Sequence, residues 1–96
     1  MFNEAYKITK LTADGLVKTG AGVIHTITFT CDDAAPTAGS VKVFDNTTNS
    51  GTEVYEETFT TTAFRGYTVT LDCAVSTGIY VDFTTTADVN CIVTYR

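Results

Sequence analysis

Residues 23–31 alternate between apolar and hydroxyl-bearing side chains. Val23, His25, Ile27, Phe29 and Cys31 occupy the odd-numbered positions, and threonines fill three of the positions between them. A period of two is the repeat of a β-strand that turns one face toward a core. The pattern predicts a strand of about nine residues whose odd-numbered side chains point inward.

The same alternation recurs through the rest of the chain, between residues that favour turns. Residues 46–51 combine asparagine, threonine, serine and glycine, which is the composition of a hairpin turn, and Pro36 is expected to end strand pairing in the loop after residue 31. No segment has the period of a long helix. Further strands are predicted over residues 41–45, 52–59, 67–74, 79–83 and 88–95, with a seventh around 16–18.

Short strands joined by turns at this spacing are typical of sandwiches and jelly rolls. We therefore predict an all-β fold, an antiparallel β-sandwich or jelly-roll-like barrel of six to seven short strands. A chain of 96 residues has room for one core. Residues 16–96 are assigned to this β-sandwich domain, and residues 1–15 to an N-terminal arm or to an edge strand.

The charge of the chain narrows the choice of partners. The net charge of −5 disfavours nucleic acid, because affinity for phosphates requires clustered lysines and arginines. No apolar run approaches the roughly 18 residues of a membrane helix, and the N-terminus lacks the pattern of an export signal. Residues 1–18 hold three lysines and two acidic residues, a net +1, so that −6 falls on the remainder.

The three cysteines, Cys31, Cys73 and Cys91, are each in phase with apolar neighbours two residues away. We expect them to face inward as reduced thiols, because free cysteine behaves as a small apolar residue. One disulfide with a spare thiol remains an alternative, since inward-facing cysteines in a two-sheet core can lie within bonding reach. A zinc site formed with His25 would have suitable donors, but the chain lacks the paired spacing of such sites.

No residue pattern indicates catalysis or a cofactor. His25 is the only histidine, and its apolar neighbours at two-residue spacing predict a structural, hydrogen-bonded role on or at the end of the core face. Residues 45–51 with Glu56 resemble a calcium loop in their oxygen donors, but Ser50 stands where that loop requires glycine. We expect a hairpin turn there, no metal, and a protein that is not an enzyme.

The leading segment mixes apolar side chains with positive charge. Such a segment could lie on an acidic protein surface as an adhesive arm, or it could be an edge strand that adds to a neighbouring sheet. We predict a partner interface in this segment, formed by Phe2, Tyr6, Lys7, Ile8, Lys10 and Leu11.

Residues 19–25, 39–47, 50–52, 77–81 and 87–95 form a series of short turn and strand motifs. Together these motifs resemble small β-sandwich virion proteins of tailed bacteriophages. In that group a "G-x-G-[VL]-[LI]-H" strand, a "V-x-[LV]-[YF]-D-N-T" hairpin, a "[ST]-G-[IL]-x-V" strand and an "A-D-V-x-[VC]-x-[VY]" ending recur in this order. The resemblance covers about residues 15–96, and it extends neither to the cysteines and the loop over residues 32–38 nor to the leading segment.

The resemblance implies a structural virion protein assembled in the cytoplasm of a bacterial host. The expected role is a capsid decoration or cement protein that binds the outer surface of the head, contacts the major capsid protein and forms a homo-oligomer, a trimer. A tail adaptor or fibre-associated module that binds tail proteins is an alternative. A carbohydrate-binding β-sandwich is another, but it requires exposed aromatic platforms, and Tyr55, Tyr67 and Tyr80 are scattered along the chain.

Overall fold

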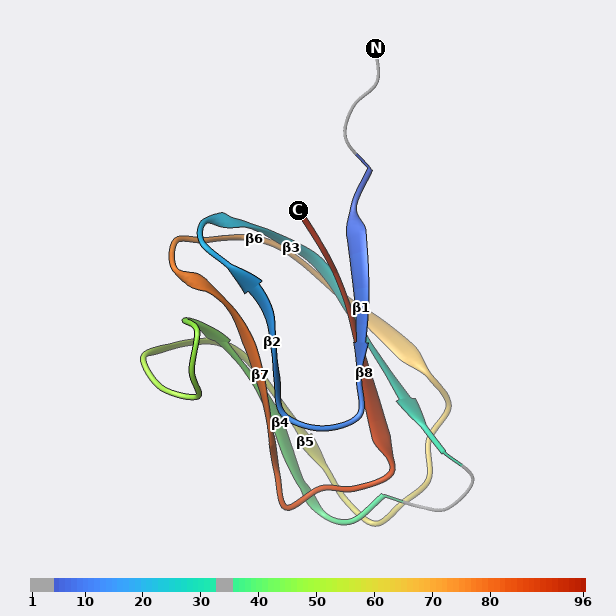
Figure 1. Ribbon diagram of the computed structural model, residues 1–96. Helices are drawn as coiled ribbons and strands as arrows, with labels where there is room; N and C mark the ends of the chain where they lie inside the picture. The colour runs from blue at the N-terminus through green and yellow to red at the C-terminus, as the bar shows by residue number, and fades with distance from the viewer. Residues whose placement is uncertain (1–4, 33–35) are drawn as a thin grey trace.

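A computed structural model describes residues 5–32 and 36–96, which form two antiparallel sheets of four strands packed face to face (Figure 1). The predicted all-β sandwich is confirmed, with eight strands rather than six to seven. The described part of the chain contains no helix that could cross a membrane. The strands are β1 (Lys7–Leu11), β2 (Gly15–Thr19), β3 (Gly22–Cys31), β4 (Gly39–Asp45), β5 (Thr52–Phe59), β6 (Tyr67–Val75), β7 (Gly78–Thr84) and β8 (Val89–Tyr95).

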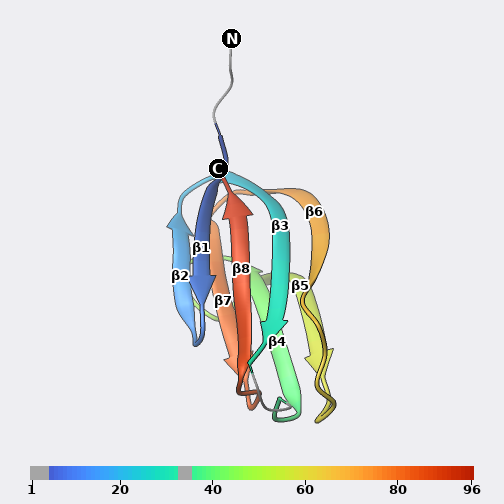
Figure 2. The same cartoon turned by 90° about the vertical axis from the view of Figure 1, so that its right-hand side faces the viewer.

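The order of the strands is that of a jelly roll. The first sheet has the order β1-β8-β3-β6, which Figure 2 shows side by side, and the second has the order β2-β7-β4-β5. Each strand of the first half of the chain pairs with its counterpart from the second half, β1 with β8, β2 with β7, β3 with β6 and β4 with β5. These pairs are nearly symmetric about the turn at residues 46–51, so the chain is one long hairpin rolled into two sheets.

The core lies between the sheets and is made almost entirely of β-branched and aromatic side chains. Alternate residues of each strand point into it, as the period of two predicts. The largest fully buried side chains are Phe29, Ile24, Ile27, Ile79, Val41, Val43, Val81, Val89, Val93 and Cys91.

The prediction that the odd-numbered side chains of β3 point inward is wrong for the first half of the strand. The register of β3 shifts between Ile24 and Thr26 against both of its neighbours, β6 and β8. One extra residue in a strand reverses which side chains face the core, and so Ile24 is fully buried while Val23 and His25 are only half-buried. The strand partners decide where such a bulge falls, and the alternation within residues 23–31 gives no sign of it.

The expectation that all three cysteines are buried holds only for Cys91, which lies in the core opposite Phe29. Cys31 and Cys73 are half-buried, because β3 ends at Cys31 and β6 is an edge strand. No disulfide joins the three residues, all of which belong to the described part of the chain.

Candidate functional site

The predicted partner interface falls mainly on β1, an edge strand of the first sheet. One side of β1 pairs with β8, and no other described strand pairs with its second side. Lys7, Ile8 and Lys10 are exposed there, and Ile8 retains 68% of its surface. An apolar side chain that is so exposed to water, at a strand edge without a pairing strand, is available for contact with a partner.

Two of the predicted interface residues do not belong to this surface. Leu11 points to the opposite face of β1 from Lys10, where it is half-buried and packs against the core. It therefore cannot serve as an exposed anchor. Phe2 lies outside the described residues. The exposed interface residues that the structure brings together, here called the β1 edge, are Tyr6, Lys7, Ile8 and Lys10.

Tyr6, the residue before β1, is held by a cluster of side chains. Its ring stacks on His25 with centroids 4.2 Å apart and an angle of 8° between the ring planes. The Arg96 guanidinium lies 4.7 Å from the centre of the same ring. Cation–π and stacking contacts of this kind restrict the ring. Tyr6 is nevertheless 39% exposed, so it is an ordered part of the β1 edge.

His25 is hydrogen-bonded, as the sequence predicts, but it does not lie on the core face of β3. Its Nδ1 atom lies 2.5 Å from Oδ1 of Asp72, and both side chains are partly exposed. Asp72 occupies the facing bulge in β6 with φ of 46°, a left-handed conformation that aspartate tolerates better than most residues. The matching bulges of β3 and β6 therefore create the pair.

The candidate metal sites are not assembled. His25 lies on the outer side of the first sheet, whereas Cys91 lies in the core, so the zinc ligand set is divided between two faces. Residues 5–32 and 36–96 contain no group of three or more histidine, cysteine or acidic side chains that could hold a metal ion.

Asp45, the first residue of the calcium-like segment, binds the protein's own backbone. Its carboxylate accepts hydrogen bonds from the N–H groups of Ser76, Thr77 and Gly78 at 3.0, 2.8 and 3.3 Å. These bonds, that of Ser76 first, lower the pKa of Asp45. The carboxylate ties the β4–β5 turn to the β6–β7 turn, which is a structural role.

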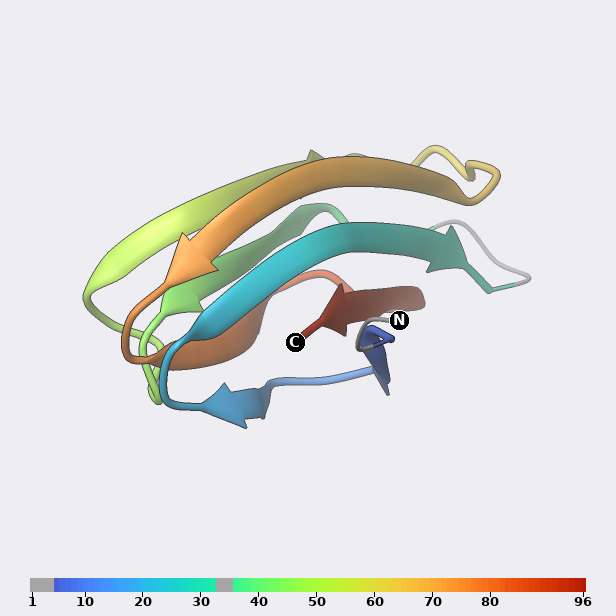
Figure 3. The ribbon, with the colours of Figure 1, turned by 90° about the horizontal axis from the view of Figure 1, so that it is seen from above.

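Aromatic residues gather at the other side of the sandwich, where β5 and β6 are the edge strands of the two sheets (Figure 3). Phe59 lies 5.4 Å from Phe29 and 5.4 Å from Phe64, centroid to centroid. Tyr67 lies 5.5 Å from Phe64 and 5.7 Å from Phe29. Because no strand of the described residues closes the sandwich on this side, these rings fill the gap between the sheets.

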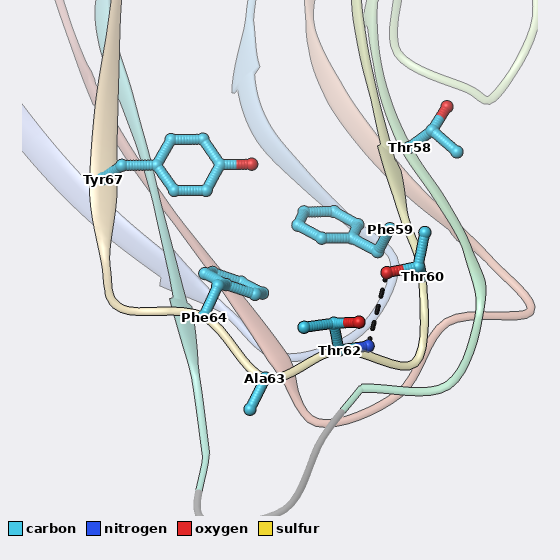
Figure 4. Close-up of a pocket in the computed structure, with 7 residues that line it drawn as sticks. All are labelled: Thr58, Phe59, Thr60, Thr62, Ala63, Phe64 and Tyr67. Atoms are coloured by element: carbon cyan, nitrogen blue, oxygen red, sulfur yellow. Dashed lines mark hydrogen bonds between the residues drawn. The ribbon is translucent and has the colours of Figure 1, made fainter.

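A hollow of about 250 Å³ opens over this aromatic group. Phe59 from the end of β5 and Tyr67 from the start of β6 point toward one another across it, and the connection over residues 60–66 forms its floor (Figure 4). The residues that line it are Thr58, Phe59, Thr60, Thr62, Ala63, Phe64 and Tyr67.

A carboxylate fixes the tyrosines beside the hollow. Glu57 accepts a hydrogen bond from the Tyr55 hydroxyl. Burial and the hydrogen bond to Glu57 raise the pKa of Tyr55 to about 12, and the same two causes raise the pKa of Tyr67. Both tyrosines are therefore neutral hydrogen-bond donors at physiological pH.

Sequence reasoning did not find this hollow. Of the three tyrosines considered, only Tyr67 lines the hollow, whereas Tyr55 of β5 stands beside it and Tyr80 is in β7. The only local signal is that aromatic residues stand on both sides of the 60–66 connection, with Phe64 within it.

Comparisons with protein-family models, with curated proteins and with solved structures gave no match to this chain. Function is therefore inferred from the residues themselves and from the surfaces that the fold leaves open.

Proposed function

We propose that this chain is a structural protein of a tailed-phage virion that decorates the outer surface of the capsid and attaches through the β1 edge. The observation that carries the proposal is the side of β1 that pairs with no described strand, where exposed Ile8 stands between Lys7 and Lys10 in the sequence. The resemblance of residues 15–96 to small phage virion proteins supplies the virion setting, and jelly rolls recur among viral capsid domains.

The β1 edge offers two kinds of attraction to a shell. Burying the exposed part of Ile8 at an interface is worth on the order of 1–2 kcal/mol. Lys7 and Lys10 add attraction toward an acidic surface, and this part weakens with salt. The unpaired backbone of β1 can also continue a sheet of the partner.

The proposal assigns no chemistry to the chain. Asp72 could orient His25 as a base. A catalytic base, however, also needs a nucleophile or a substrate site within hydrogen-bond reach. The side chain stacked on His25 is Tyr6, which Arg96 covers in turn. This arrangement fits an ordered binding surface.

The first test is the number of copies of the chain in purified particles. A decoration protein is present in hundreds of copies, of the order of the number of capsid subunits, whereas a tail component is present in a few. Quantitative mass spectrometry against the major shell protein measures this ratio. A handful of copies per particle would refute the capsid assignment.

The second test is rebinding to particles from which the chain has been stripped. We expect Ile8→Glu and Lys10→Glu to weaken co-sedimentation about tenfold each, the Lys10 effect mainly at low salt. Thr70→Glu is the matched control, because Thr70 is an exposed residue of β6, the opposite edge strand of the same sheet. Wild-type attachment of both β1 variants would show that the chain binds through another surface.

A further inference from the structure

The hollow between β5 and β6 has a composition that selects one class of ligand. Its seven lining residues are three aromatic residues, three threonines and an alanine, and none of them carries a charge. The nearby carboxylate of Glu57 is engaged by the Tyr55 hydroxyl. Such a lining favours a neutral ligand that has both apolar faces and hydroxyl groups.

The aromatic rings supply flat apolar surface that is held in place. Phe59 packs on Phe29 and Phe64 and is almost fully buried. Tyr67 packs on Phe64 and keeps 36% of its surface exposed. Because buried Phe59 supports Phe64, and Phe64 supports Tyr67, these two more exposed rings lose little side-chain freedom when a ligand stacks on them.

The threonines supply hydrogen bonds along the floor. The Thr60 hydroxyl oxygen accepts a hydrogen bond from the backbone N–H of Thr62 at 3.3 Å, as Figure 4 shows, which leaves the Thr60 hydroxyl hydrogen to donate. A hydroxyl group both donates and accepts, so it pairs with a ligand hydroxyl in either direction. The Thr62 side chain lies beside it in the same floor.

The size of the hollow limits the part of a ligand that it can hold to one ring. An apolar cavity of about 150 Å³ holds a benzene molecule, and this hollow of about 250 Å³ holds one six-membered ring with its substituents. A pyranose ring has C–H groups that stack on aromatic faces and equatorial hydroxyls that reach the threonines. We propose that this hollow binds the terminal pyranose ring of a neutral glycan.

This site is independent of the β1 edge. In the first sheet β1 and β6 are the opposite edge strands, and Figure 3 shows β1 and β2 on one side of the sandwich and β5 and β6 on the other. A chain attached through β1 therefore keeps the hollow open to a second partner. Binding of the sugar is measurable on the isolated protein, so its outcome does not depend on any capsid.

The experiment is a titration of isotope-labelled protein with methyl glycosides of glucose, galactose, mannose and N-acetylglucosamine, followed by amide chemical shifts. We expect a neutral sugar to shift resonances of residues 58–67 in a saturable way, with a dissociation constant in the millimolar range that is usual for so small a ligand. Glucuronate and glucosamine, which are charged, serve as controls and should bind at least about tenfold more weakly.

Three variants assign the binding to the hollow. Thr62→Val removes one exposed hydroxyl, keeps the shape of the side chain and should weaken binding about fivefold. Phe64→Leu removes an aromatic face and should weaken it by about the same factor. Tyr6→Ala is the matched control, since it removes an exposed tyrosine at the opposite side, and should leave binding unchanged.

Three results would overturn the proposal. The first is no saturable shift with any neutral sugar up to about 50 mM, well above the expected dissociation constant. The second is a response to charged sugars alone. The third is a dissociation constant that neither Thr62→Val nor Phe64→Leu changes. A thermal melt of each variant separates a lost site from a lost fold.

Discussion

Leu11 and Ile8 stand on the same short strand, and truncating each of them tests whether β1 is packed in solution. Leu11 packs against the core, and a Cβ atom placed on Gly15 would come within 2.8 Å of its Cδ2 atom. Ile8 is 68% exposed on the other face of the strand. Leu11→Ala therefore removes packed atoms, and Ile8→Ala removes atoms that are mostly in water.

The expected magnitudes follow from burial. Fully buried leucines lose about 2–5 kcal/mol of stability on truncation to alanine. Half-buried Leu11 should lose about 1–2 kcal/mol, and Ile8 no more than about 0.5 kcal/mol. In a domain of this size 1 kcal/mol lowers the melting temperature by about 4–8 °C, so Leu11→Ala should melt about 5–15 °C below the wild type.

The assay is thermal unfolding followed by circular dichroism, repeated in urea to confirm that the slope of the transition is unchanged. Equal melting temperatures for Leu11→Ala, Ile8→Ala and the wild type would show that residues 7–11 are a free arm and would refute the packing of β1. Deletion of residues 1–12 is a weaker test, because it removes the attachment surface and a strand of the sheet together.

Two further outcomes follow from the pKa shifts. The backbone hydrogen bonds to Asp45 hold its pKa below 3.8, so the stability that they contribute is present above that pH and is lost as the pH falls through the folded-state pKa. The stability difference between the wild type and Asp45→Asn should therefore shrink in melts below about pH 4, and a difference independent of pH would contradict this role. Burial raises the pKa of Cys91 to about 12, so in the native protein Cys91 should react more slowly with a thiol reagent at pH 8 than Cys31 or Cys73, and all three should react after denaturation. If Cys91→Ser removed the fastest-reacting thiol, Cys91 would be exposed, and β8 would pair in a different register.

The sequence predicted the edge strand β1 only as one of two alternatives. Alternation within residues 7–11 is compatible with an arm as well as with a strand, because a five-residue segment has too few periods to decide. The pairing of β1 with β8 decides it, and that pairing joins residues at opposite ends of the chain. The same pairing turns Leu11 inward and leaves Ile8 and Lys10 on the outer face.

The sequence by itself determined the strands other than β1, because the period of two and the turn residues between them are local properties. It predicted β3 to β8 to within two residues at each end. Tertiary structure decided the bulge at His25, since the position of an extra residue depends on the strands on both sides. It also decided the aromatic hollow, whose rings come from β5, β6 and their connection and meet only because those two strands are the edges of facing sheets. Alternation shows which face of a strand is apolar, whereas the contacts between faces depend on how the whole hairpin rolls up.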